Sequence, residues 1–455
     1  MQKQAYVRDM TRGSILRHML AFALPLLIGN LFQQLYNVVD TMVVGYRLGD
    51  GAIAAIGATV SLYSMIVDFA CDLNNGYGII VTQRFGAGDP RQMRKAVAGM
   101  MELNAVAALT IPTLSLIFLR PLLGLMNTPA DLLGQSYAYI SVICAGIPVT
   151  IAYNMFASIL RSVGNSRTPL VFLIVSSVLN VALDFLLVWG LDMGVGGAAL
   201  ATVLAQLTAT VLSGSYVWRH YRAYLPRRED LRVPGRLLVT LLLSGGSLAL
   251  MSIVVELGTV IFQSAANLLG QMYIAAHSSA RRLLIIMIQP VISLSVANMT
   301  FIGQNWGAQR MDRIRPAIRT GVMLEILWGL FAAAVLFFLG EPLIRFTTGT
   351  TDPVMLHNAK VSLRINCVLY PVLGVLFCLR NTMQAMGHKV IPVLSSCIEM
   401  AMKLLAVALF IPRWGFIGVC ITEPVTWVLM TAFLCAAYFA FRRRWLNGAE
   451  KPAAL

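Results

Sequence analysis

The chain has 455 residues, of which 58% are hydrophobic and 12% are charged, and its mean hydropathy is +0.74. Soluble domains carry roughly 25% charged residues, so this composition excludes a soluble enzyme or binding module and indicates a polytopic membrane protein. The net charge of +15 does not imply nucleic-acid binding, because the basic loops of such a protein lie beside anionic lipid. All seven cysteines fall in hydrophobic stretches, where an odd number argues against a disulfide framework.

Twelve apolar segments follow one another along the chain, and each is long enough to cross a hydrocarbon core of about 30 Å. In chain order they cover residues 20–46, 53–81, 96–119, 132–160, 168–189, 195–218, 237–262, 272–302, 317–339, 354–379, 390–411 and 415–440. The first is interpreted as a retained span, because its apolar run is too long for a signal peptide and lacks a clear cleavage site. The predicted fold class is an all-α integral membrane protein with twelve transmembrane helices.

The sequence repeats itself at about half its length. The motif QRFGA, which begins at Gln83, returns as QNWGA, which begins at Gln304. This repeat predicts two six-helix lobes, residues 1–222 and 223–455. An even number of spans per lobe gives both lobes the same orientation, so a pseudo-two-fold axis should run along the membrane normal, as in many transporters. Three glycine pairs follow the same repeat: Gly164 with Gly387, Gly194 with Gly415, and Gly197 with Gly418.

Lysine and arginine are distributed unevenly between the two sides of the membrane. With the N-terminus in the cytoplasm, 26 of the 35 basic residues fall in the inner segments and four in the outer connections. Inner loops of membrane proteins are enriched in these residues, which predicts that both termini are cytoplasmic. We expect a multi-pass protein of the cytoplasmic (inner or plasma) membrane that contacts lipids, binds no nucleic acid and acts as a monomer.

The sequence contains no motif for nucleotide or zinc chemistry. The patterns G-x-x-x-x-G-K-[ST], H-E-x-x-H and G-x-S-x-G are absent, and the five histidines are scattered. The glycine-rich segment 85–89 (FGAGD) lacks a phosphate-binding lysine and is interpreted as a tight cytoplasmic turn. The chain is therefore expected to be a transporter rather than an enzyme, to need no cofactor and to use an ion gradient.

Two acids lie deep within predicted spans, where charge is costly and tends to mark an ion or substrate pathway. At 1.5 Å per residue, Asp40 lies roughly 20–30 Å into the first span and Asp184 about 24 Å into the fifth. Asn180 lies one turn before Asp184 on the same helical face, and Thr202 reaches a similar depth in the sixth span. These oxygen-bearing residues suit Na⁺ and suit proton exchange equally well. The alternative is that each acid satisfies a backbone group or caps a helix break.

The second half provides an internal comparison. When the two halves are superimposed in sequence, Asn180 and Asp184 align with Glu399 and Lys403, whose spacing favours an ion pair. The cation site is therefore expected in the first lobe only, and this pair either neutralises itself or lines the substrate cavity. Glu256 is a second candidate cation contact, or else an interhelical hydrogen-bonding residue. The candidate substrate cavity comprises Gln34, Tyr36, Asn37, Glu256, Glu399 and Lys403.

Several motifs, taken in order, resemble those of multidrug and toxic compound extrusion (MATE) transporters, in the bacterial branch related to DinF and MepA. They are NLFQQLYNVVD at 30–40, AAIG at 54–57, FGAGD at 85–89, GN at 164–165, NVALD at 180–184 and GQN at 303–305, together with Gln263 and Asn267. The resemblance covers nearly the whole chain.

This resemblance implies a V-shaped antiporter that exports organic, often cationic, compounds in exchange for Na⁺ or H⁺. It also implies an ion-coupling role for Asp40, Asn180, Asp184 and Thr202. Glu256 departs from this branch, which usually has an apolar residue there, whereas other branches keep a glutamate in the same helix.

Three other functions fit the sequence less well. A lipid-linked glycan flippase of the same superfamily commonly has about fourteen spans and a cationic cavity, whereas this chain has twelve spans and acids in its first lobe. An integral-membrane enzyme would need polar catalytic residues clustered at one membrane face. A channel is disfavoured because a duplicated architecture suits alternating access better than a fixed pore.

Overall fold

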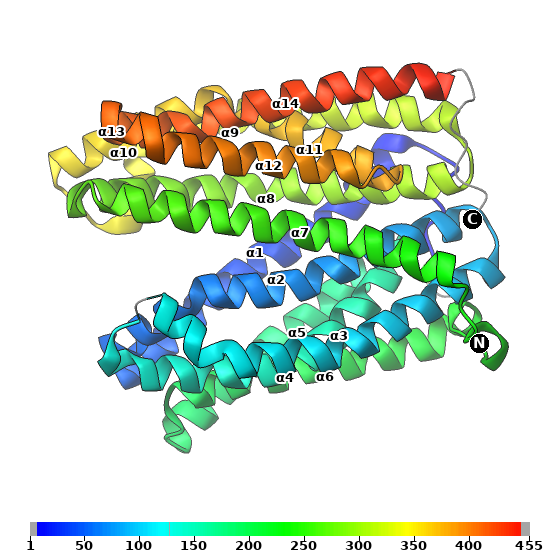
Figure 1. Ribbon diagram of the computed structural model, residues 1–455, viewed down its shortest axis with the longest axis horizontal. Coiled ribbons are helices and arrows are strands. Elements are labelled where there is room, and N and C mark those ends of the chain that lie inside the picture. The colour runs from blue at the N-terminus through cyan, green and yellow to red at the C-terminus, as the bar shows by residue number, and fades with distance from the viewer. Residues whose placement is uncertain (1–6, 127, 447–455) are drawn as a thin grey trace. The chain divides into compact units, whose positions relative to one another are not determined.

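The computed structural model describes residues 7–126 and 128–446, and over these residues its regular structure is entirely helical (Figure 1). In the first half the helices are α1 (Ile15–Leu48), α2 (Asp50–Gly86), α3 (Pro90–Leu125), α4 (Ala130–Ser162), α5 (Arg167–Asp184), the π-helix η1 (Phe185–Gly190) and α6 (Gly194–His220). Two short 3₁₀ helices follow in the linker, η2 (Arg222–Tyr224) and η3 (Arg228–Asp230). In the second half they are α7 (Gly235–Asn267), α8 (Gln271–Gly307), α9 (Met311–Thr348), α10 (Pro353–Val368), α11 (Tyr370–Ala385), α12 (Val390–Leu405), the π-helix η4 (Ala406–Phe410), α13 (Ile411–Trp414) and α14 (Phe416–Leu446).

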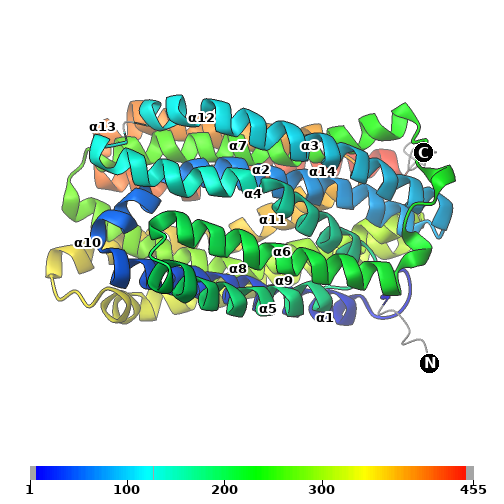
Figure 2. The same cartoon turned by 90° about the horizontal axis from the view of Figure 1, so that it is seen from below.

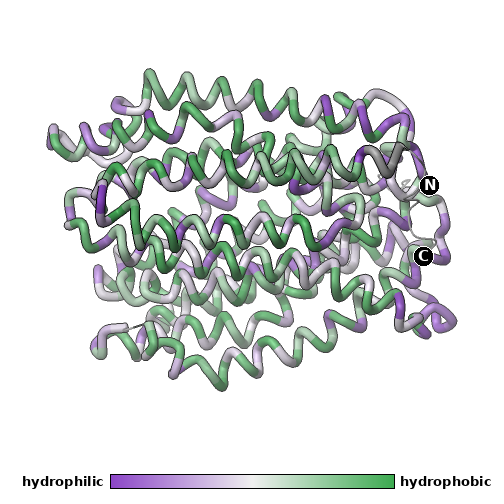
Figure 3. Tube along the Cα trace, turned by 45° about the horizontal axis from the view of Figure 1, so that its top comes forward, coloured by the Kyte–Doolittle hydropathy of each residue, from purple (hydrophilic) through white to green (hydrophobic). Residues whose placement is uncertain are grey.

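The predicted number of membrane spans is confirmed. Eleven described helices, some continued through a π-helix, are long and apolar enough to cross a bilayer. The twelfth span is the pair α10 and α11, which are bent by 50° at Leu369. Pro371 explains this break, because proline has no backbone N–H and cannot continue a preceding helix. Hydrophobic residues follow the helices over most of their length, and hydrophilic residues gather at the helix ends (Figure 3).

The backbone itself carries the predicted repeat. Both halves place a residue with positive φ at matching turns: Gly49 and Gly270, Gly88 and Gln309, Gly164 and Gly387, Gly194 and Gly415. The fifth and twelfth helices also end in the same way, since each continues into a π-helix, beginning at Phe185 and at Ala406. The repeated sequence motifs thus correspond to repeated turns and to a repeated change of helix type.

By packing, the described chain divides into two compact units that differ from the predicted lobes in two segments. The first unit holds residues 7–10 and 24–252, and the second holds 11–23 and 253–446. The first half of α7 joins the first unit because it packs directly on α2, where a Cβ atom on Gly76 would lie 2.4 Å from the Ser244 carbonyl oxygen. Residues 11–23 join the second unit, in which Arg313 donates a hydrogen bond to the Gly13 carbonyl at 2.8 Å.

Each unit has its own apolar core. In the first unit α4 packs against α2, α3 and α6 (Figure 2). Ile140 and Leu160 of α4 are fully buried. In the second unit α8 and α9 pack against each other and against α10 and α11. Large apolar side chains such as Leu109, Ile117 and Phe338 are exposed, as expected for helices that face lipid. All seven cysteines are free thiols, in agreement with the prediction.

Candidate ion and substrate sites

A buried polar cluster occupies the first unit where α1, α5 and α6 approach one another. Asp184 and Asn180, one turn apart on α5, are 0% and 1% exposed. The Asn180 amide nitrogen donates to Asp184 Oδ2 at 3.0 Å, and its oxygen accepts from the Thr202 backbone N–H at 3.0 Å. The Thr202 hydroxyl donates to the Ala198 carbonyl at 3.1 Å and accepts a hydrogen bond from Tyr36 of α1. Asn180 therefore links α5 to α6 and orients Asp184.

Asp40 of α1 completes this cluster, because its carboxyl group is hydrogen-bonded to that of Asp184. Two carboxyl groups can form such a bond only when one of them carries a proton that it donates to the other. The Oδ1 atoms of both residues are buried and accept no hydrogen bond from any residue that the structure describes. The structure thus brings together all four residues predicted for the ion site, and adds Tyr36.

The donor set can be compared with the needs of the two candidate ions. Two buried carboxylate oxygens that lack a partner among the described residues are ligands that fit a hard cation such as Na⁺. The Asn180 amide oxygen accepts one hydrogen bond, from Thr202, and its second lone pair could coordinate a cation. The carboxyl–carboxyl hydrogen bond fits a proton without any rearrangement. Both ions fit, and the proton needs the smaller change.

The π-helix η1 begins directly after Asp184, and π-helical turns often occur at functional sites. Gly197 allows α6 to pack beside it, since a Cβ atom there would lie 2.9 Å from Met193 Cβ and 3.3 Å from the Leu187 carbonyl oxygen. Its repeat partner Gly418 lies against η4, where a Cβ atom would approach the Phe410 carbonyl to 2.3 Å. These repeated glycines are explained by the close packing of a helix on each π-helix.

The other predicted cavity residues are distributed over both units. The side chains of Gln34 and Asn37 are exposed on α1 in the first unit. Glu256 belongs to the second unit, is half-buried, and makes no hydrogen bond or ion pair with the residues that the structure describes. It is not among the residues that line the cavity of that unit.

The second-unit cavity has a volume of about 270 Å³ and is enclosed by side chains of α7, α8, α10, α11, α12 and α14. Glu399 and Lys403 line it and form the ion pair that their spacing predicts, with Nζ donating to Oε1 at 2.9 Å. Lys403 also donates to Thr259 Oγ1 at 2.8 Å. The charged side chains that line the cavity are Arg281, Arg380, Glu399, Lys403 and Glu423.

Three of these charged residues, Arg281, Arg380 and Glu423, were not predicted as site residues. Arg380 follows directly after the predicted span 354–379, and the structure places it inside α11 with only 9% of its surface exposed. A predicted span longer by one helical turn would have included Arg380 and identified it as a candidate site residue. Arg380 is therefore a buried residue of the second unit.

The alignment of Asn180 and Asp184 with Glu399 and Lys403 also needs correction. The π-helices of the two halves begin at Phe185 and at Ala406, so these two residues occupy the same place in the repeat. In this register Asp184, the residue before η1, corresponds to Leu405, the residue before η4, and not to Lys403. The sequence alignment is in error because two polar residues four positions apart can be matched to any other such pair, whatever the alignment of the residues around them. The Glu399–Lys403 pair is consequently a separate feature of the second half.

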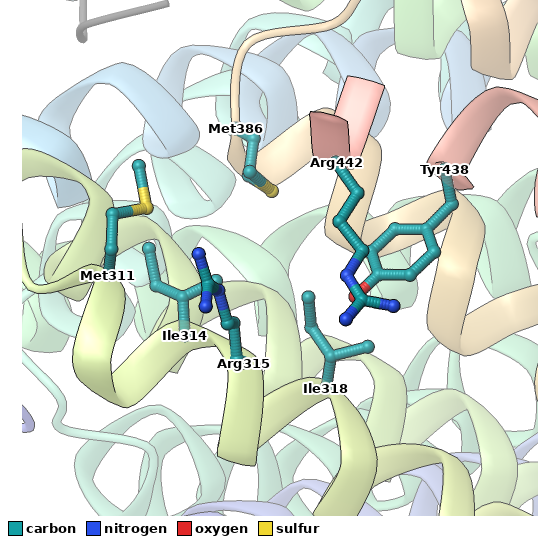
Figure 4. Close-up of a pocket in the computed structure, with 7 residues that line it drawn as sticks. All are labelled: Met311, Ile314, Arg315, Ile318, Met386, Tyr438 and Arg442. Carbon is teal, nitrogen blue, oxygen red and sulfur yellow. The ribbon is translucent and has the colours of Figure 1, made fainter. Parts of the chain in front are cut away.

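A much smaller hollow, about 10 Å³, lies near the ends of α9, α11 and α14 (Figure 4). Arg315 of α9 and Arg442 of α14 both approach it, and the ring of Tyr438 lies beside the Arg442 side chain. This space is no larger than a single water molecule requires, so it has no room for an organic ligand.

Known proteins match this chain in both sequence and fold. Residues 25–186 and 247–409 each match the family model described as MatE, which confirms the predicted internal repeat. The chain is 27% identical to the probable multidrug resistance protein YoeA of Bacillus subtilis, over 87% of this chain and 86% of that protein. It is 26% identical to the DNA damage-inducible protein F of Escherichia coli, over 94% and 92%. A solved variant of the Vibrio cholerae MATE transporter VcmN shares the fold, with a TM-score of 0.87 at 21% identity over 96% of this chain and 98% of that one.

Proposed function

The chain belongs to the MatE family and is a multi-pass membrane protein, and from this premise we propose that it is a secondary antiporter. It exports small organic compounds, including cations of the multidrug type, in exchange for H⁺ or Na⁺. The export of drugs is suggested by YoeA, which is named as a probable multidrug resistance protein. The glycan flippase is not favoured by these relatives.

The observation that carries this proposal is the contact between the carboxyl groups of Asp40 and Asp184. Two neighbouring carboxylates repel each other, so the pair gains stability by taking up a proton or a cation. A coupling ion must be bound on one side and released on the other, which requires a site of this bistable kind. Because a single proton placed between the two carboxyl groups would remove their repulsion, we propose H⁺ as the coupling ion, with Na⁺ as the second candidate.

We also propose that the protein lies in the cytoplasmic membrane with both termini in the cytoplasm and acts as a monomer. The support for the orientation is the concentration of lysine and arginine in the inner segments. The support for a monomer is that one chain supplies both copies of the MatE repeat.

The test is ethidium transport in everted membrane vesicles, with pH and Na⁺ gradients imposed separately. The wild-type protein should move ethidium only when a gradient of its coupling ion is present. Asp40→Asn and Asp184→Asn should each abolish this coupled transport while the protein still inserts, because either change removes one of the two ionisable partners.

Asp192→Asn is the matched control, since Asp192 is exposed and pairs with Arg47 at 3.2 Å outside the cluster. It also has a φ of 52°, which asparagine tolerates. This variant should retain wild-type transport. Wild-type transport rates in Asp40→Asn or Asp184→Asn would contradict the proposed ion site. Ethidium transport at a rate that depends on neither the pH gradient nor the Na⁺ gradient would contradict antiport itself.

A further inference from the structure

The second-unit cavity carries more positive than negative charge. Three cations line it, Arg281, Arg380 and Lys403, against the two acids Glu399 and Glu423. Lys403 and Glu399 neutralise each other at 2.9 Å. Two arginines and one glutamate remain, so the cavity has one uncompensated positive charge when these five side chains are charged and His277, which also lines it, is neutral.

Arg380 has a buried guanidinium group whose hydrogen-bonding capacity is only partly used. It is 9% exposed, and its Nε donates to Ser395 Oγ at 3.1 Å. One terminal nitrogen is buried and has no hydrogen-bond partner among the described residues. The nearest carboxylate contact, from Nη2 to Glu399 Oε2, is 3.9 Å long and so is an ion pair without a hydrogen bond. A buried guanidinium with a free N–H is a ready donor for a carboxylate or another oxyanion.

Arg281 supplies the second positive charge. It is half-buried on α8 and makes no ion pair within the part of the chain that the structure describes. Glu423 interacts with it electrostatically, but the hydrogen bond of the Glu423 side chain is made with Trp427. Both arginines therefore line the same cavity, and neither donates a hydrogen bond to a carboxylate of the residues that the structure describes.

The rest of the wall is aromatic and apolar. Tyr370 and Trp427 form an edge-to-face pair with ring centroids 6.2 Å apart, and Phe377 lies on the same wall. The Tyr370 hydroxyl already donates to the Leu284 carbonyl at 3.0 Å, so its ring rather than its hydroxyl is left for a ligand. A volume of about 270 Å³ is near the lower end of small-molecule sites, which span roughly 300–1,000 Å³.

We propose that the second-unit cavity binds small aromatic anions, with Arg380 and Arg281 receiving the anionic group and the aromatic wall receiving the ring. This ligand class goes beyond the organic cations of the proposed function. One negative charge in the ligand neutralises the cavity, whereas a cationic ligand would add to its excess charge. The site is independent of the Asp40–Asp184 cluster, which belongs to the first unit.

The experiment compares two ligands that share a ring and differ in charge, naphthylacetate and naphthylethylammonium. Their binding to the purified full-length protein in lipid nanodiscs is measured by isothermal titration calorimetry, with no ion gradient present. Naphthylacetate should bind more tightly than naphthylethylammonium. Because a hydrogen bond to a charged group is worth about one to two factors of ten, Arg281→Gln and Arg380→Gln should each weaken naphthylacetate binding by roughly ten- to hundredfold.

Two further variants sharpen the test. Arg282→Gln is the matched control, because Arg282 is the exposed neighbour of Arg281 and does not line the cavity; it should leave binding unchanged. Arg281→Lys keeps the charge and should retain most of the affinity. If Arg380→Gln fails to fold after losing its bond to Ser395, Arg281→Gln decides alone. Equal binding of the two ligands, or naphthylacetate binding within about twofold of wild type in the folded glutamine variants, would overturn the proposal. Neither result depends on ion-coupled transport, so this proposal and the proposed function fail separately.

Discussion

At the scale of single residues, some of the charged side chains inside the described units are held by specific partners. Asp184 is oriented by Asn180, and Lys403 is held by both Glu399 and Thr259. Such contacts matter because removing one partner of a buried ion pair leaves an uncompensated charge, which is more damaging than removing both. The Glu399–Lys403 pair allows this to be measured outside the ion site.

Lys403→Ala should lower stability more than the double change of Glu399→Ala with Lys403→Ala. The single change leaves Glu399 with only the 3.9 Å contact to Arg380, at an expected loss of about 3–5 kcal/mol. The double change removes both charges and should recover part of this loss. The measurement is the thermal unfolding midpoint of the purified variants in detergent; additive losses would show that the two residues act independently.

A second buried pair joins Asp230 of the linker to Arg94 near the start of α3. Asp230 accepts from Arg94 Nε at 2.6 Å and from the Arg227 backbone N–H at 3.1 Å. Burial by itself raises the pKa of Asp230, but these hydrogen bonds and the positive charges of Arg94 and Arg227 outweigh it and hold the pKa below its ordinary value. A lowered pKa in the folded state stabilises the fold above the unfolded pKa of about 3.9, and this contribution is lost as the pH falls.

Asp230→Asn should therefore destabilise the protein at pH 7, and the difference from wild type should shrink as the pH falls below about 4. The control is Asp312→Asn, because the Asp312–Arg310 pair is largely exposed and exposed ion pairs contribute little to stability. Thermal unfolding midpoints between pH 3 and pH 7 provide the readout. A pH-independent difference between wild type and Asp230→Asn would show that the carboxylate charge is not what matters.

At the scale of helices, close packing is made possible by small residues at particular positions. The crossing of α2 and α7 depends on Gly76 and Gly245, and the Ser244 hydroxyl donates to the Gly76 carbonyl at 2.8 Å. Helix pairs in membranes gain stability mainly from such tight contacts, because lipid provides little hydrophobic driving force. The same principle explains why glycines recur beside both π-helices.

Two adjacent glycines of α7 allow a matched test. A Cβ atom on Gly245 would lie 2.4 Å from the Tyr77 ring and 2.7 Å from the Leu73 carbonyl oxygen, whereas one on Gly246 meets nothing within 4 Å. Gly245→Ala should therefore lower stability by about 1–3 kcal/mol through overpacking. Gly246→Ala should be neutral or stabilise by up to about 1 kcal/mol, because alanine favours the helix. Unfolding midpoints compare the two, and equal effects would contradict the tight crossing.

At the scale of the whole molecule, two copies of one unit carry different chemistry. The first unit buries a carboxyl pair, and the second unit encloses a cavity with excess positive charge. In an antiporter the coupling ion must influence the transported compound, and linkage requires the reverse influence to be equally strong.

Ethidium affinity of the purified protein should therefore fall as the coupling ion rises, by a factor within the usual range of about 5–150. Fluorescence titrations at several pH values and Na⁺ concentrations measure this factor. Dependence on one ion that disappears in Asp40→Asn would identify that ion and assign Asp40 as one of its ligands. Affinity that is independent of both ions would contradict antiport.

The sequence by itself determined the membrane class, the twelve spans, the repeat and the ion pair between Glu399 and Lys403. Each of these depends on local properties: mean hydropathy, segment length, and spacing along a helix. The four residues of the carboxyl cluster could be named from their depth in the spans, because depth follows from the rise per residue.

Only the tertiary structure decided which of these residues touch and how they are connected. The hydrogen bond between Asp40 and Asp184, the burial of Arg380, and the attachment of the first half of α7 to α2 all join segments that are distant in sequence. Hydropathy describes how a segment meets lipid, but it does not specify which neighbour a helix faces or how it is rotated. The neighbour and the rotation of a helix are set by side-chain packing and by small residues such as Gly76 and Gly245. The effect of such a glycine depends on which residues of the neighbouring helix pack against it.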